Sequence, residues 1–239
     1  MTTDSAAHKV QLQSYFNGIG FERWSAIYGQ APLSRIRRTV REGHELMLAQ
    51  VDLWLSETRS GGTLLDAGCG TGLFSVAMAR RGFEVTAIDI APRMVQAAQA
   101  YAQQAGVADR IRFMQGDLES VSGSFDAVVC LDVLVHYPRE AFERLSTLLA
   151  QRCATGPLLF TYAPYNRFLA LLHWLGGHFP KDHRRAEIQM TPDRVVNEVL
   201  AAAGMCVRRT ADISHGFYHI KLLEAVREET RLRKEGLND

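Results

Sequence analysis

Short apolar runs and amphipathic segments alternate through the middle of the chain. The apolar runs have the length of buried strands and occupy residues 63–67, 84–88, 111–115, 125–131 and 157–162. Between them, apolar residues recur at helical spacing over 73–81, 92–104 and 138–151. Strands that alternate with helices in this way pair in parallel and are covered by helices on both faces. The pattern therefore predicts an α/β fold with a mostly parallel sheet.

The two ends of the chain extend this arrangement. An amphipathic segment at 32–55 precedes the first strand and indicates a helical N-terminal cap. Toward the other end, a helix at 191–203 leads to apolar runs at 205–213 and 217–226, which flank a Ser-His-Gly turn. Two strands joined in this way form a hairpin. We therefore expect a sheet of seven strands that closes with a C-terminal antiparallel pair.

An acid and a glycine loop follow the first predicted strand. Asp66 ends the strand, and Gly68, Gly70 and Gly72 occupy alternate positions after it. Glycine adopts backbone conformations closed to other residues, so such a loop can pass close beneath a ligand. A dinucleotide site would read G-x-G-x-x-G and hold a phosphate, which a neighbouring carboxylate repels. A carboxylate suits a cation, so the loop favours S-adenosylmethionine, which carries a sulfonium and an ammonium group.

Two further acids follow the second and third predicted strands. Asp89 comes about 20 residues after the loop, where a βαβ unit places a carboxylate on ribose hydroxyls. Asp117 can accept a hydrogen bond from the adenine amine, and Leu118 beside it can cover the ring. Each acid alone also fits a solvated surface, and the loop alone fits a ligand-free turn. Acids at three successive strand ends meet at one sheet edge, which favours the cofactor site.

Composition narrows the class of protein. The chain is 47% hydrophobic and 22% charged, as expected of one folded domain. Its formal net charge of +1 carries no electrostatic footprint for nucleic acid. The four cysteines form no C-x-x-C pair, which indicates neither a zinc site nor a disulfide framework. Because residues 1–9 resemble no signal region and no apolar run has bilayer length, we expect a soluble cytoplasmic protein.

Three segments outside the core sheet have the composition of a substrate site. The first is dense in aromatic side chains over 15–29 and leads into an arginine-rich stretch. The second leaves the fourth strand, where a parallel sheet opens its ligand crevice, and carries His136. The third is an apolar, aromatic insertion at 164–190 that turns basic and is typical of a lid. Simple packing of the aromatics and a structural His136 are the alternative interpretations.

These segments divide one predicted domain into consecutive parts. The parts are a helical cap (1–59), a cofactor-binding half (60–163), a lid insertion (164–190), a C-terminal helix and hairpin (191–226) and a charged tail (227–239). We expect the tail to be solvated or to form a frayed helix.

The motif from Asp66 to Gly72, with Asp89, Asp117 and the predicted strand order, resembles class I S-adenosylmethionine-dependent methyltransferases over about residues 60–226. That resemblance implies a Rossmann-like fold. From about residue 15 to 226 the chain is similar to the magnesium-protoporphyrin IX O-methyltransferases, in the segments 15–29, 41–44, 130–138, 159–164 and 217–226. Its arginines between 32 and 39 are more numerous than that family leads us to expect.

The resemblance implies methyl transfer to one propionate of magnesium-protoporphyrin IX in chlorophyll and bacteriochlorophyll synthesis, with S-adenosylhomocysteine as the second product. We assign the reacting propionate to a catalytic pair, Tyr28 and His136. The predicted cofactor residues are Arg41, Asp66, Gly68, Gly70, Gly72, Asp89, Ile90, Asp117, Leu118 and Leu131. Arg41 is expected on the cofactor's carboxylate. The predicted substrate contacts are Tyr15, Phe16, Trp24, Arg184 and Arg185, of which one of the two arginines binds the spectator propionate.

A propionate explains why this set contains no general base. Its pKa of about 4 to 5 makes it a nucleophile near neutrality, so catalysis reduces to orientation. We expect no metal site in the protein. His173, His178 and His183 raise the question of an axial ligand to the porphyrin magnesium, but they lack a metal-site spacing and magnesium prefers oxygen.

Two other functions fit parts of the sequence. A methyltransferase acting on a quinone or phenol would share the sheet and the aromatic cap, with His136 as a base. A non-enzymatic tetrapyrrole carrier would keep the fold without turnover. Beyond the substrate, the resemblance implies exchange with the large subunit of magnesium chelatase. The amphipathic segment 168–174 could also lie on a membrane surface.

Overall fold

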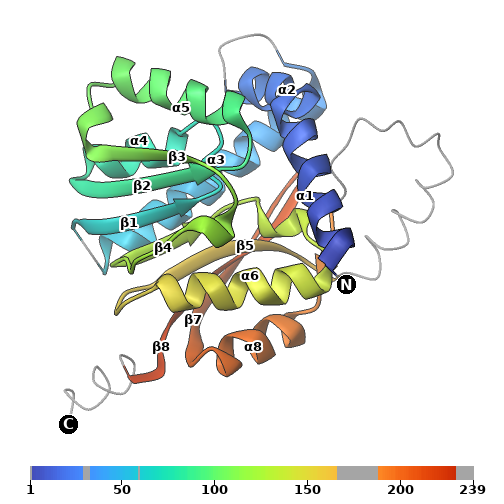
Figure 1. Ribbon diagram of the computed structural model, residues 1–239, viewed down its shortest axis with the longest axis vertical. Coiled ribbons are helices and arrows are strands. Elements are labelled where there is room, and N and C mark those ends of the chain that lie inside the picture. The colour runs from blue at the N-terminus through green and yellow to red at the C-terminus, as the bar shows by residue number, and fades with distance from the viewer. Residues whose placement is uncertain (1, 29–32, 59, 166–187, 230–239) are drawn as a thin grey trace, which may run out of the picture.

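The computed structural model describes residues 2–28, 33–58, 60–165 and 188–229, and Figure 1 shows a twisted sheet between two layers of helices. The sheet has eight strands in the order β3-β2-β1-β4-β5-β8-β7, with β6 paired to β5 outside this path. The β1–β2, β1–β4, β2–β3 and β4–β5 pairs are parallel, whereas β8 runs antiparallel to both β5 and β7. The predicted fold class is confirmed, and β6 is a strand that the sequence pattern did not predict.

The strands lie where the apolar runs predicted them. They are β1 (Gly62–Ala67), β2 (Phe83–Asp89), β3 (Ile111–Gln115), β4 (Ala127–Cys130), β5 (Leu158–Pro164), β6 (Met190–Thr191), β7 (Met205–His215) and β8 (Tyr218–Arg227). Only β4 is clearly shorter than its apolar run, because Phe125 forms an isolated bridge with Cys153 and the chain turns sharply at Asp132. The hairpin turn lies at Gly216 and Phe217, since His215 pairs with Tyr218.

Helices cover both faces of the sheet. One face carries α3 (Arg35–Ser56), α4 (Leu73–Arg80) and α5 (Pro92–Gln104), and the other carries α6 (Arg139–Arg152) and α8 (Asp193–Ala202). Adjacent residues of β1 serve the two layers, because Leu64 packs with α3 and α4 while Leu65 packs with α6. The helix α3 buries Met47 and Val51 against the sheet. The second half of the predicted cap is therefore part of the core.

Two N-terminal helices, α1 (Thr2–Asn17) and α2 (Ile19–Tyr28), lie over the carboxyl ends of β2 and β3 (Figure 1). Three polar contacts attach α1 there: Lys9 to Glu119 at 2.8 Å, Gln13 Nε2 to the Ile90 carbonyl at 3.1 Å, and the Asn17 side chain to the Arg93 amide at 3.1 Å. No described helix is long and apolar enough to cross a membrane.

Candidate functional site

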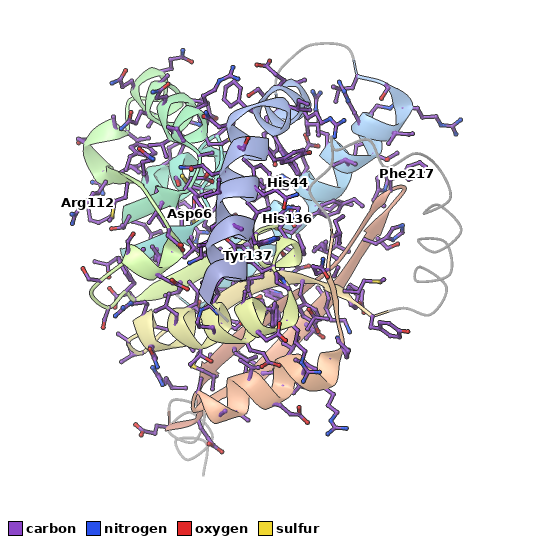
Figure 2. The ribbon with its side chains drawn as sticks, turned by 45° about the vertical axis from the view of Figure 1, so that its right-hand side comes forward. His44, Asp66, Arg112, His136, Tyr137 and Phe217 are labelled. Atoms are coloured by element: carbon purple, nitrogen blue, oxygen red, sulfur yellow. The ribbon has the colours of Figure 1, made fainter. Side chains whose placement is uncertain are left out.

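A cavity opens at the carboxyl ends of β1, β2 and β4 beneath the N-terminal helices. Its empty volume is about 990 Å³, counted with its open mouth. Figure 2 shows Asp66, His44 and His136 near one another in the middle of the molecule, whereas Phe217 lies at the tip of the β7–β8 hairpin. Two walls of different chemistry line the cavity.

The first wall, which we call the loop wall, consists of Asp66, residues 68–71, Asp89 and Ile90, whereas the predicted cofactor residue Gly72 is not among the lining residues and approaches Ala98 of α5. The amides of Gly68 and Cys69 both donate to the Ile88 carbonyl, at 2.8 and 2.9 Å, so the glycine loop is tied to β2. Gly68 has a φ of 92°, and a Cβ there would lie 2.1 Å from a methyl carbon of Val133. A side chain at Gly70 would meet no atom within 4 Å. The loop therefore faces open space at Gly70 and touches the opposite wall at Gly68.

Asp66 gives the loop wall a buried acid. Its carboxylate is 2% exposed, lines the cavity and accepts a hydrogen bond from the Ser75 hydroxyl of α4. Burial raises the pKa of Asp66 to about 7, the nearby charge of Asp89 adds to this rise, and the Ser75 hydrogen bonds oppose it. A cation bound in the cavity would favour the ionised form. The group is thus suited to a positively charged ligand.

The other two predicted acids have partners in the protein. Asp89 accepts from the amides of Gly70 and Ala91 at 3.0 and 2.9 Å, and burial raises its pKa against these hydrogen bonds. Asp117 pairs with Lys9 of α1, and Leu118 beside it is buried in the cavity lining. Of the remaining predicted cofactor residues, Ile90 and Leu131 also line the cavity. The ribose and adenine assignments stay predictions.

The second wall is a polar network of four residues from α2, α3, the turn after β4, and β8: Tyr28, His44, Asp132 and Tyr218. The Tyr28 hydroxyl lies 3.0 Å from His44 Nε2, and this same nitrogen lies 3.9 Å from Asp132 Oδ2. The Tyr218 hydroxyl donates to both carboxylate oxygens of Asp132, at 3.0 and 2.7 Å. Tyr28, His44 and Asp132 line the cavity, and Tyr218 supports Asp132 from behind.

Asp132 has an unusual backbone for this task. Its φ of 56° is the only positive value at a non-glycine residue in the described part of the chain. Such a conformation costs about 1–2 kcal/mol and occurs most often at functional sites. The Thr161 hydroxyl holds the turn, since it accepts from the Asp132 amide at 2.6 Å and lies 3.2 Å from Oδ1. The strained turn aims the carboxylate at His44 and Tyr218.

Sequence analysis did not assign roles to His44, Asp132 or Tyr218. All three fall inside segments that carried the family resemblance, at 41–44, 130–138 and 217–226. Their separation along the chain hides the network, because nothing local places a residue of α3 beside one of β8. The sharpest local signal is Gly43, where a Cβ would lie 2.6 Å from the Tyr218 ring and would prevent this close approach.

The structure brings the predicted catalytic pair to the same cavity. Tyr28 reaches it from α2, and His136 reaches it from a short helical turn, Leu134–His136. Burial raises the pKa of Tyr28 well above its usual value, and the charge of Asp132 adds to this rise. Tyr28 is therefore a protonated phenol at neutral pH. The His136 ring packs edge-on against the Phe16 ring, with ring centres 5.3 Å apart. The backbone carbonyl oxygen of His136 lies 2.8 Å from His8 Nε2.

Of the other predicted substrate and cofactor residues in the described chain, two line the cavity and two do not. Phe16 and Trp24 line the cavity, and Trp24 stacks on Tyr28 with ring centres 5.5 Å apart. Tyr15 packs on Phe16, and Arg41 donates to the carbonyls of Ile27 and Ala26 at the end of α2; neither is among the cavity-lining residues of the described chain. Their ligand roles stay predictions.

The remaining assignments fall outside the described residues. These are Arg184 and Arg185, the lid helix, and His173, His178 and His183. Within the described ranges, no group of three or more histidine, cysteine or acidic side chains could hold a metal ion.

Comparisons with known proteins show which proteins the chain is similar to. Residues 130–227 match a family model described as magnesium-protoporphyrin IX methyltransferase C-terminus, and residues 64–156 match a methyltransferase domain model. The chain is 34% identical to magnesium-protoporphyrin O-methyltransferase of Synechocystis sp., over 95% of this chain and 100% of that protein. It is 32% identical to the magnesium-protoporphyrin O-methyltransferase of Rhodobacter capsulatus, over 94% and 99%. The crystal structure of magnesium protoporphyrin IX methyltransferase from Synechocystis PCC 6803 with bound S-adenosylhomocysteine superimposes with a TM-score of 0.84 at 34% identity, over 92% of this chain and 100% of that one.

Proposed function

The chain belongs to the magnesium-protoporphyrin O-methyltransferase family, and from this membership we propose that it methylates one propionate of magnesium-protoporphyrin IX. S-adenosylmethionine is the methyl donor, and S-adenosylhomocysteine and the monomethyl ester are the products. This reaction lies in chlorophyll and bacteriochlorophyll synthesis. The observation that carries the proposal is one cavity with an acid-bearing loop wall facing a wall of buried hydrogen-bonding groups.

The loop wall fits the methyl donor. Asp66 supplies a buried carboxyl with a pKa of about 7, and the unobstructed space at Gly70 lets a ligand approach the backbone. We place the sulfonium and ammonium groups near Asp66, the ribose near Asp89, and the adenine between Ile90 and Leu118. In this arrangement the positive end of the donor meets an acid whose ionised form it would stabilise.

The opposite wall fits a carboxylate acceptor. One propionate oxygen attacks the methyl carbon as the carbon–sulfur bond breaks, and the electron pair of that bond becomes a lone pair on sulfur. No proton is transferred, so the protein supplies orientation, which can lower a barrier by about 7–11 kcal/mol. We assign Tyr28 and His136 to hydrogen bonds that orient the propionate. A neutral donor orients the oxygen without quenching its charge as an arginine would.

The test is incubation of the purified protein with S-adenosylmethionine and magnesium-protoporphyrin IX, followed by mass spectrometry. We expect the porphyrin to gain one methyl group, and incubation of metal-free protoporphyrin IX alongside measures whether magnesium is recognised. A parallel reaction with a quinol in place of the porphyrin tests whether the protein instead methylates a quinone-type or phenolic acceptor. Methylation of the quinol alone, or tight porphyrin binding without any ester, would overturn the proposal.

Substitutions at the catalytic pair test the residue assignment. Tyr28→Phe and His136→Ala should each lower kcat by about tenfold or more, because each removes one orienting hydrogen bond, while cofactor affinity stays near wild type. Tyr101→Phe and His219→Ala, which change a residue of α5 and an exposed residue of β8, serve as matched controls. Wild-type turnover in both test variants would contradict the assignment.

We also propose that the substrate arrives from the large subunit of magnesium chelatase, and that the protein is cytoplasmic with peripheral membrane contact. The support is an exposed apolar and basic area near the hairpin tip: Phe217 is 69% exposed, Ile36 is 54% exposed, and Arg35, Arg37 and Arg38 are exposed beside Ile36. Co-sedimentation of wild type and Phe217→Ser with anionic vesicles, and pull-down with the chelatase subunit, test the two contacts separately. If Phe217→Ser binds both the vesicles and the chelatase subunit as well as wild type does, this area does not support either contact.

A further inference from the structure

We infer that Asp132 and His44 are positioning residues that direct the hydroxyl hydrogen of Tyr28 into the cavity. Asp132 keeps the imidazole proton of His44 on Nε2, and His44 donates this proton to the Tyr28 oxygen. The hydrogen of Tyr28 itself is then left for an oxygen of the acceptor. The inference rests on the proposed function, because the proposed substrate supplies the carboxylate that Tyr28 binds.

One nitrogen atom of His44 lies close to both a phenol and a carboxylate. His44 Nε2 lies 3.0 Å from the Tyr28 oxygen and 3.9 Å from Asp132 Oδ2. In a neutral imidazole this nitrogen either carries a hydrogen or presents a lone pair. A lone pair facing a carboxylate is repelled, whereas an N–H is attracted. The neighbouring Asp132 therefore favours the Nε2–H tautomer of His44.

Asp132 is held in the form that this role requires. The Tyr218 hydroxyl donates to both of its oxygens, and the Thr161 hydroxyl lies within hydrogen-bond distance of Oδ1. An ionised carboxylate can accept all of these hydrogen bonds, whereas in a protonated carboxyl group one lone-pair position is occupied by the carboxyl hydrogen. His44 is 8% exposed, and its burial lowers its pKa although the charges of Asp132 and Glu45 oppose this, so near neutral pH the ring carries a single proton.

The tautomer of His44 decides which way Tyr28 can donate. If Nε2 presented a lone pair, the Tyr28 hydroxyl would donate to it and would turn its hydrogen away from the acceptor. With Nε2 protonated, the Tyr28 oxygen accepts from His44, and its own hydrogen takes the other position in the plane of the ring. Stacking of Trp24 on Tyr28, with an interplanar angle of 23°, holds that plane. The network thus converts a phenol of ambiguous direction into a directed donor.

Nitrogen NMR of the protein labelled with 15N-histidine reads the tautomer directly and requires no turnover. We expect the His44 Nε2 signal, assigned by its loss in His44→Gln, at the position of a protonated ring nitrogen. In Asp132→Asn it should move to the position of an unprotonated nitrogen, because the new amide can donate toward it. Asparagine tolerates the left-handed backbone, so this substitution preserves the turn. An unprotonated Nε2 in wild type, or no change in Asp132→Asn, would refute the inference.

Kinetics test whether the tautomer acts through Tyr28. Asp132→Asn should lower kcat by about tenfold, the size expected of one misdirected hydrogen bond, with little change in KM for the porphyrin. In a Tyr28→Phe background the same substitution should have almost no further effect. An equal loss of kcat in both backgrounds would show that Asp132 acts independently of Tyr28. Affinity for S-adenosylhomocysteine and the melting temperature check that each variant folds.

A second pair of variants keeps the inference testable if Asp132→Asn does not fold. The amide nitrogen of His44→Gln can donate to Tyr28 in place of Nε2, whereas His44→Met fills similar space without a donor. We expect about tenfold higher kcat for the Gln variant than for the Met variant. Equal activities would overturn the positioning role. If wild type makes no methyl ester at all, the proposed function fails, while the NMR result still decides the tautomer.

Discussion

The two walls of the cavity are built in opposite ways. The loop wall comes from one continuous stretch, because β1, the glycine loop, α4 and β2 follow each other within residues 62–89, and backbone hydrogen bonds hold the loop on β2. The network wall takes one residue from each of four elements, and 190 positions separate Tyr28 from Tyr218. A site made of neighbours can be recognised in a sequence, while a site made of distant residues exists only after folding.

The walls also differ in what they do with buried charge. On the loop wall, burial raises the pKa of both Asp66 and Asp89, so their ionised forms are destabilised, and a cation bound beside Asp66 would offset this. On the network wall, Asp132 is surrounded by the hydroxyls of Tyr218 and Thr161, which stabilise its charge without any bound ligand. In the proposed arrangement the methyl donor completes the first wall, whereas the polar groups of the second wall have their hydrogen-bond partners within the protein.

The largest expected effect concerns the charge of Asp66. Its pKa is about 7 in the folded protein and near 3.8 in the unfolded chain, so between these values the folded state keeps a proton that the unfolded state has released. The contribution of Asp66 to stability therefore falls as the pH rises from about 4 to about 7, by up to about 4 kcal/mol. Above pH 7 the contribution stays constant.

Urea unfolding of wild type and Asp66→Asn at several pH values between 4 and 8 measures this contribution. The free energy of unfolding of wild type, minus that of the variant, should decrease across the window and then level off. Subtracting the variant removes the effect of titrating groups that do not interact with Asp66, while Asp89, whose charge acts on Asp66, contributes to the difference. A constant difference would show that Asp66 is not strained as an anion, and the contrast between the walls would disappear.

The next largest effect tests where the two walls touch. Gly68→Ala should destabilise the protein by about 3 kcal/mol, because it combines a left-handed backbone with a methyl group placed 2.1 Å from Val133. Gly70→Ala is the matched control, with a φ of 52° and no atom within 4 Å of the new methyl, and should cost only about 1 kcal/mol. Equal losses in thermal unfolding of the two variants would mean that the backbone alone requires glycine.

A smaller effect with a change of sign tests the assembly of the network wall. Gly43→Ala should destabilise by about 1–2 kcal/mol, since the added methyl would lie 2.6 Å from the Tyr218 ring, although alanine is the better helix former. In a Tyr218→Gly background the Cβ, Cγ and ring atoms that the methyl would meet are all gone, and the same substitution should become stabilising by up to about 1 kcal/mol. If Gly43→Ala has the same sign in both backgrounds, close packing of α3 on β8 does not explain the glycine.

How much the sequence revealed follows the same division. The strands, the glycine loop and the position of Asp66 could be predicted, because each depends on residues within one turn or one strand of one another. The strand β6 could not, since two residues, Met190 and Thr191, leave no periodic pattern. The network could not either: the placement of His44 beside Asp132 depends on how α3 packs on the sheet, which no short segment encodes.

The contact between Gly68 and Val133 has a consequence for the design of new specificities. It joins the loop wall to the residue that follows Asp132, so in the proposed arrangement an apolar contact, and no reacting group, would set the distance from the methyl donor to the acceptor. A bulkier or shorter acceptor acid could therefore be accommodated by resizing position 133 while every polar group stays as it is. The size of the acceptor acid that fits the cavity could in this way be changed without changing the polar residues.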